Sequence, residues 1–142
     1  MICRTHLSLS FLFAFFVVKL LVPENAVVFV LVALFASLLP DIDSGSSMLG
    51  KHFSFFLRHR GFLHSFFAPA VLLFFLPESI YFLAFCIGYF SHLVGDMLTV
   101  QGVMPVYPVS RVRFSGFMAT GSFAEDVFFV FLVALDIFAV LI

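Results

Sequence analysis

Residues 80–100 read IYFLAFCIGYFSHLVGDMLTV, an apolar stretch that carries His92 and Asp96 near its end. These two residues are four positions apart, so on a helix they lie one above the other on the same face. The stretch has the ~20 residues that a helix needs to cross a bilayer. A charged side chain in such a helix costs roughly 2.5–3.5 kcal/mol on insertion scales. The sequence therefore predicts a membrane helix whose polar pair needs a structural or functional reason.

The whole chain has the composition of a membrane protein. Its 142 residues are 63% hydrophobic and only 11% charged, with 24 phenylalanines and a mean hydropathy of +1.22, which is typical of a chain embedded in a bilayer. The formal net charge of −1 gives no reason to expect nucleic acid as a partner. The two cysteines, Cys3 and Cys86, are far apart, and we expect neither a disulfide nor a thiolate metal site.

Five apolar stretches predict the fold class. They cover residues 7–22, 26–39, 62–76, 80–100 and 123–142 and are separated by Pro, Glu, Asn, Ser and Gly. We predict an all-α integral membrane protein of about five helices, between four and six, in one domain over residues 1–142. Pro105 and Pro108 argue against a continuous helix in residues 101–122, which we expect to cover a site at the cytoplasmic interface. Ser122 and Glu125 fit a capping box that opens the last helix.

The basic residues predict the topology. Most of them fall in the N-terminus, the second connection or the fourth connection, namely Arg4, Lys51, Arg58, Arg60, Arg111 and Arg113. Because cytoplasmic segments carry the excess of Lys and Arg, we predict a multi-pass membrane protein with a cytoplasmic N-terminus. Lys19 can reach the opposite interface from the end of the first helix. Asp136 lies towards that outer side and receives no predicted role.

On this topology six polar residues gather at one membrane face, and they are His6, Asp41, Asp43, His64, His92 and Asp96. Histidine and carboxylate are the ligands of hydrolytic metal sites. Each motif alone has a simpler interpretation. His92 and Asp96 can form a hydrogen bond within a packed seam, and Asp41 with Asp43 can be a solvated helix exit. Arg58 to Arg60 can anchor anionic lipids, and His52 beside Lys51 is expected to be solvated.

Small residues recur along the helix predicted over residues 80–100, at Ala84, Gly88, Ser91 and Gly95. This spacing lets a neighbouring helix approach closely. The neighbour can be another helix of the same chain or a second copy of the protein. The pattern therefore leaves a homo-oligomer through this face open.

Four motifs in series resemble a known family. They are Leu38-Leu39-Pro40-Asp41-Ile42-Asp43, His59-Arg60-Gly61-Phe62-Leu63-His64-Ser65, Gly88-Tyr89-Phe90-Ser91-His92-Leu93-Val94-Gly95-Asp96-Met97-Leu98-Thr99, and Gly102-Val103 with Tyr107-Pro108. In order and spacing they resemble the YdjM-like family of membrane-bound metal-dependent hydrolases over about residues 1–115. The resemblance implies an inner-membrane protein with a divalent metal site.

The order of the candidate ligands is also similar to that of zinc-dependent phospholipase C and the single-strand zinc nucleases. That analogy implies a primary site of His64, His92, Asp96 and one of Asp41 or Asp43, with His6 holding a second ion bridged by Asp96. One or two Zn²⁺ ions are expected, with Mn or Fe as alternatives. The analogy favours cleavage of a phosphoester.

Two functions follow from these observations. The first is hydrolysis of a phosphoester or another ester of a membrane lipid at the cytoplasmic face. In this function the carboxylate of Asp41 or Asp43 that is not a ligand acts as general base, and His59 with Arg60 binds the substrate phosphate. The second is a non-catalytic membrane protein whose His and Asp cluster is a structural or sensing metal site.

Overall fold

The computed structural model describes residues 1–43, 62–73 and 79–142, without the side chains of residues 42, 43, 72 and 73. Five α-helices occur in these ranges: α1 (Cys3–Leu21), α2 (Ala26–Leu38), α4 (Phe67–Leu73), α5 (Ile80–Met97) and α6 (Phe123–Leu141). Two short 3₁₀ helices, η1 (Pro40–Asp43) and η2 (Phe62–His64), lie between α2 and α4. The described residues contain two isolated β-bridges and no strand. The predicted all-α class is therefore confirmed.

Local sequence signals set the helix ends. The side chain of Asn25 accepts a hydrogen bond from the Val28 N–H at 3.1 Å, and Ser79 caps α5 in the same way through the Phe82 N–H at 3.2 Å. These contacts satisfy N–H groups that have no partner within the helix. Helix α1 ends at Leu21. It is followed by the capping residue Val22, whose φ of 45° is left-handed, and by Pro23, which cannot continue a helix.

Helices α1, α2 and α5 form the centre of the bundle. Ala14, Phe29, Ala33 and Ala84 are fully buried where these three helices meet. Gly88 of α5 lies directly on the backbone of Ala33, so close that a Cβ atom there would be 1.9 Å from the Ala33 carbonyl oxygen. The predicted small-residue seam is thus filled by α1 and α2 of the same chain, and an oligomer contact through it would require those helices to move away.

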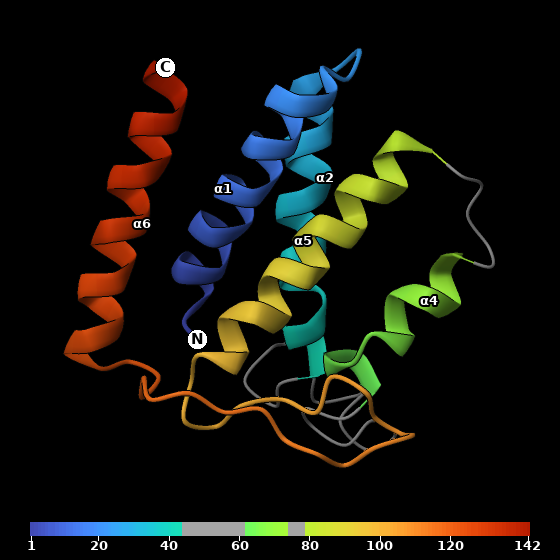
Figure 1. Ribbon diagram of the computed structural model, residues 1–142, viewed down its shortest axis with the longest axis vertical. Coiled ribbons are helices and arrows are strands. Elements are labelled where there is room, and N and C mark those ends of the chain that lie inside the picture. Colours follow the sequence, from blue (N-terminus) through green and yellow to red (C-terminus); the bar gives the residue numbers. More distant parts are fainter. Residues whose placement is uncertain (44–61, 74–78) are drawn as a thin grey trace.

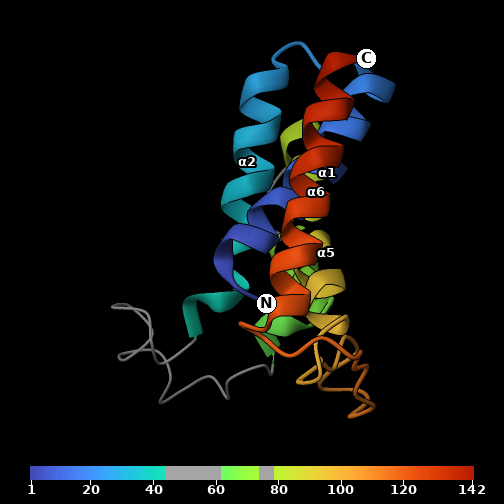
Figure 2. The ribbon, with the colours of Figure 1, turned by 90° about the vertical axis from the view of Figure 1, so that its left-hand side faces the viewer.

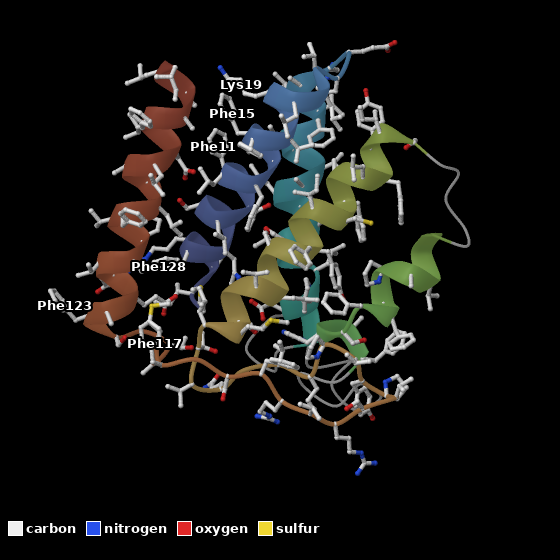
Figure 3. The ribbon with its side chains drawn as sticks, viewed as in Figure 1. Phe11, Phe15, Lys19, Phe117, Phe123 and Phe128 are labelled. Carbon is white, nitrogen blue, oxygen red and sulfur yellow. The ribbon has the colours of Figure 1, made fainter. Side chains whose placement is uncertain are left out.

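Helix α6 packs beside α1 on the outside of the bundle (Figure 1). Arg4 forms an ion pair with Asp126 and lies over the ring of Phe129, with 4.9 Å between the guanidinium carbon and the ring centroid. Ser8 donates a hydrogen bond to Asp136, which gives that residue a partner that the sequence did not indicate. Figure 3 shows Phe11, Phe15 and Lys19 along the side of α1 that faces α6.

The predicted helix over residues 62–76 is wrong in its first part. The chain forms η2 over Phe62–His64 and only then enters α4 at Phe67. Ser65 lies between them, and its hydroxyl donates to the Phe62 carbonyl at 2.7 Å. Pro69 explains the break, because a proline lacks an N–H and its ring clashes with the carbonyl four residues earlier, which here belongs to Ser65. Residues 74–76 lie outside the described residues.

Two of the helices in the described ranges, α1 and α5, are long and apolar enough to cross a membrane. Helix α2 is apolar but has only 13 residues, fewer than the ~20 that a full span needs. Large apolar side chains nevertheless lie on the outside of the bundle, among them Phe16, Leu31, Phe35 and Phe131, each more than half exposed. A contiguous apolar surface of this kind is typical of lipid contact. The membrane class is supported, whereas five complete spans are not.

The N-terminus, the lower end of α2, the start of α4 and the end of α5 lie at one end of the bundle, and the C-terminus lies at the other (Figures 1 and 2). The connection from Leu98 to Ser122 runs across the first end as an irregular segment. Backbone hydrogen bonds hold it there, including Val100 N–H to the Met118 carbonyl at 2.9 Å and Phe66 N–H to the Pro105 carbonyl at 2.9 Å. The prediction that residues 101–122 do not form a continuous helix is confirmed.

Candidate metal centre

Four elements bring five of the six predicted side chains together at this end of the bundle. They are His6 from α1, Asp41 from η1, His64 from η2, and His92 and Asp96 from α5. The three histidines and Asp96 are completely buried. Asp41 is the exception, because 37% of its side chain is exposed. The cluster is therefore a buried polar site with one partly accessible carboxylate.

The ligand atoms of His64, His92 and Asp96 all lie within 4.8 Å of one another, a spacing that could hold one ion. The Nε2 atom of His64 lies 3.6 Å from Asp41 Oδ1 and 3.7 Å from Asp96 Oδ2. The Nε2 atom of His92 lies 3.8 Å from each of the same two oxygens. In a tetrahedral zinc site with bonds of about 2.0–2.2 Å, ligand atoms lie roughly 3.3–3.6 Å apart. These residues could hold a divalent metal after shifts of a few tenths of an ångström.

The hydrogen bond of His92 defines which of its nitrogens faces the cluster. Its Nδ1 atom lies 2.7 Å from the carbonyl oxygen of Ser37. A carbonyl only accepts hydrogen bonds, so Nδ1 carries the proton and, in the neutral ring, Nε2 presents a lone pair. That buried Nε2 has no hydrogen-bond partner within residues 1–43, 62–73 and 79–142 and faces the carboxylates of Asp41 and Asp96. A lone pair aimed at two anionic groups is unfavourable without a cation between them, whereas metal ligands commonly have this second hydrogen bond to a carbonyl.

His6 completes the inner side of the cluster. Its ring stacks on His92 with 3.9 Å between centroids, and its Nε2 atom lies 3.4 Å from Asp96 Oδ1. Gly95 makes this approach feasible, because a Cβ atom there would be 3.1 Å from Nδ1 of His6. His6, Asp41 and His92 also form a group whose ligand atoms lie within 4.8 Å of one another. A second ion beside the first stays a prediction.

The surroundings of Asp41 favour its ionised form. Burial raises the pKa of Asp41, but the nearby imidazole groups of His64 and His92 lower the pKa further, so the net direction is downward. An ionised carboxylate is required both for binding a metal and for accepting a proton.

The structure adds contacts that the sequence did not reveal. The main-chain nitrogen of Met1 lies 2.6 Å from Asp96 Oδ1. The Glu125 carboxylate accepts hydrogen bonds from the Ile2 N–H at 2.6 Å and the Gly121 N–H at 2.7 Å. Ser122 caps α6 through the Glu125 N–H at 3.4 Å, which confirms one half of the predicted capping box. The other half is wrong, because the Ser122 N–H donates to the Ala119 carbonyl and Glu125 instead ties the start of α1 to α6. The spacing of residues within one helix cannot predict such a contact between two helices.

Replacing Glu125 with alanine is expected to lower the free energy of unfolding by about 2 kcal/mol, since the N–H groups of Ile2 and Gly121 would each lose their acceptor. The measurement is thermal unfolding in detergent. Asp126→Ala is the matched control, because Asp126 is half exposed in its pair with Arg4 and such pairs contribute about 0–1 kcal/mol. Equal effects of the two substitutions would contradict the anchoring function.

Comparison with known proteins identifies the family. The family model described as YdjM inner membrane protein matches residues 1–141, almost the whole chain. The chain belongs to the YdjM family. The resemblance predicted from the four motifs is thereby confirmed, and with it the class of inner membrane protein.

Curated relatives match over part of the chain. The inner membrane protein YdjM of Escherichia coli (strain K12) is 39% identical over 98 residues, which cover 58% of this chain and 50% of that protein. YvsG of Bacillus subtilis (strain 168) is 32% identical over 102 residues, covering 63% of this chain and 64% of YvsG. The chain thus spans between half and two thirds of these relatives. No solved structure matches it.

Some predicted site residues of this YdjM-family chain lie outside the described part. The backbone of Asp43 is placed in η1, but its side chain is not described, and His59 and Arg60 belong to the undescribed residues 44–61, as does His52. The predictions that Asp43 acts as ligand or base, and that His59 and Arg60 bind substrate, therefore stay predictions.

Proposed function

We propose that the protein is a membrane-bound metal-dependent hydrolase that cleaves a phosphoester or another ester of a membrane lipid at the cytoplasmic face. The observation that carries the proposal is the Nε2 atom of His92, which is buried, faces two carboxylates and has no hydrogen-bond partner among the residues that the structure describes. Membership of the YdjM inner membrane protein family supports the membrane setting.

The proposed ligands are His64, His92, Asp96 and one of Asp41 or Asp43, two nitrogens and two oxygens. This donor set suits Zn²⁺, with Mn or Fe as alternatives. When bound, such an ion lowers the pKa of a water molecule and polarises a phosphoryl or acyl oxygen. His6, through Asp96 Oδ1, is the residue that would contribute to a second ion.

The exposure and position of the other residues indicate which of them could contact the substrate, accept a proton or bind a phosphate. Asp41 is the partly exposed member of the cluster, so an ester would approach from its side. Asp41 or Asp43, whichever does not bind metal, would take the proton from the attacking water. His59 and Arg60 precede the η2 turn that carries His64, and a planar guanidinium can hold a phosphate through two hydrogen bonds.

The positions of the elements support the proposed multi-pass topology. The N-terminus, His64 and the connection that carries Arg111 and Arg113 lie at the same end of the bundle, at which the cluster lies. An excess of basic residues at this end favours the cytoplasmic side. A lipid of the inner leaflet would then reach the cluster without crossing the membrane. The charge gives no reason to expect nucleic acid as a partner.

A second function, a structural or sensing metal site, is favoured by the complete burial of His6, His64, His92 and Asp96. In that function the ion would only tie α1, η2 and α5 together. The two functions differ in whether Asp41 is needed for chemistry or only for binding.

Hydrolysis tests this difference. Metal-loaded protein in mixed micelles is expected to release a headgroup or fatty acid from at least one class among phosphatidylglycerol, phosphatidylethanolamine and diacylglycerol, as measured by mass spectrometry. Asp41→Asn is expected to lower that rate by about a hundredfold. Arg4→Ala, which changes an exposed residue on the opposite side of α1 from the cluster, is the control. Metal-loaded, folded protein that cleaves none of these lipids would leave the structural site as the better account.

A further inference from the structure

An apolar groove runs along the bundle next to the metal centre. Its volume is about 390 Å³, within the range of ligand pockets. Helix α1 forms one wall, α5 the second, and α4 with the residue before it the third. The residues that define its length are Phe16, Val17, Phe66, Pro69, Cys86 and Leu93.

The groove begins at the level of the metal centre. At that end it is bounded by Leu93, the neighbour of His92, and by Phe66, two residues after His64. Tyr89 connects the groove to the η2 turn, because its hydroxyl donates a hydrogen bond to the carbonyl of Leu63, the residue before His64. The groove and the cluster therefore share the same stretch of α5, and the groove lies next to the η2 turn.

From this end the groove extends away from the cluster along α5. Cys86 and Leu93 are seven residues apart, which corresponds to ~10 Å along a helix. Its two long walls, α1 and α5, are the helices long and apolar enough to cross a membrane. Nearly all of the lining is apolar, and the Tyr89 hydroxyl is already bonded to Leu63. Such a groove has almost no polar surface that could bind a headgroup, whereas a hydrocarbon chain would bury its apolar lining.

We infer that this groove binds one acyl chain of a membrane lipid. The ester bond at the end of that chain is thereby placed at the metal centre. The occupant follows from three observations, namely the apolar lining, the course along two candidate membrane helices, and the end at Leu93 and Phe66, close in the chain to His92 and His64. The inference deepens the proposed function and rests on it for the position of the ester, but chain binding itself does not require metal.

Native mass spectrometry of the detergent-purified full chain tests the inference, with 1-palmitoyl-2-oleoyl phosphatidylglycerol as the probe. The wild-type protein is expected to bind one lipid saturably. Cys86→Trp, which places an indole in the groove, is expected to weaken binding by about tenfold or more. Val130→Trp on α6 is the matched control, because Val130 is 65% exposed and lies outside the groove. Equal affinity of the two variants would overturn the inference.

The native cysteines give a second readout that needs no substitution. Cys86 is half-buried in the groove and Cys3 is exposed on α1. At a lipid concentration ten times the Kd, the lipid is expected to slow modification of Cys86 by methyl methanethiosulfonate about tenfold and to leave Cys3 unchanged. Equal rates at Cys86 with and without the lipid would overturn the inference even if Cys86→Trp does not fold.

His92→Ala separates this inference from the proposed function. The variant is expected to lose metal and retain the lipid. If wild-type protein binds metal but shows no saturable lipid binding, the inference that the groove binds an acyl chain is overturned and the hydrolase proposal stands. Wild-type protein that protects Cys86 but holds no metal would support the groove and overturn the hydrolase.

Discussion

Replacing His92 with alanine is expected to lower the affinity for a divalent metal by more than about a hundredfold, since loss of an outer partner alone costs 10–100-fold. His92 contributes an Nε2 atom 3.8 Å from both Asp41 and Asp96, and its ring is oriented by the Ser37 carbonyl. Asp96→Ala is expected to have a similar effect, because Asp96 faces all three histidines. The measurement is the metal content of detergent-purified protein by elemental mass spectrometry.

Val94→Ala is the matched control for this experiment, because Val94 lies on α5 between His92 and Asp96 and is not part of the cluster. It is expected to keep the wild-type metal content. Two results would argue against a metal centre. One is metal retained by His92→Ala at the wild-type level. The other is folded wild-type protein that takes up no zinc, manganese or iron on reconstitution, which would leave a His and Asp network as the better account.

The second large effect is expected from Gly88→Ala. The added Cβ atom would lie 1.9 Å from the Ala33 carbonyl oxygen and 2.8 Å from the Ala33 Cα atom. These are backbone atoms, so α2 and α5 must separate rather than repack one side chain. Overpacking usually costs about 1–3 kcal/mol, and we expect the upper end, which corresponds to about 10 °C in melting temperature for a chain of this size.

Gly95→Ala provides the contrast, because its Cβ atom would meet the ring of His6 at 3.1–3.2 Å and the sulfur of Met1 at 3.2 Å. Those side chains can give by a few tenths of an ångström, so the loss of stability is expected to be smaller. Thermal unfolding in one detergent compares the two variants. A melting temperature of Gly88→Ala equal to the wild-type value would mean that α2 and α5 do not pack as closely as described.

Family and membrane class were readable from the sequence because they depend on local chemistry. The apolar stretches over residues 26–39, 80–100 and 123–142 correspond to α2, α5 and α6 within a few residues. Asn25, Ser79 and Ser122 stand where the caps of these helices lie. The break before α4 was not predicted, although the sequence contains Pro69, because apolar composition alone does not distinguish a short helix from a longer one.

The candidate site was predictable to the extent that topology brings segment ends together. Five predicted residues lie at the ends of helices or turns on the same side of the bundle, and the structure brings them into one cluster. They are His6, Asp41, His64, His92 and Asp96. The hydrogen bond from His92 to the Ser37 carbonyl and the contacts of Glu125 with α1 could not be predicted, because they join residues 55 and 123 positions apart. No periodic pattern encodes such contacts.

The sequence by itself determined that this chain is helical, belongs in a membrane and carries histidines and carboxylates near the ends of its helices, since length, hydropathy and spacing act within each segment. The tertiary structure decided which nitrogen of His92 faces the carboxylates and which of the candidate residues approach within ligand distance. It also decided that α1 and α2 pack against the glycines of α5. These features depend on how helices cross, and a crossing is the outcome of packing between residues that are distant in the chain.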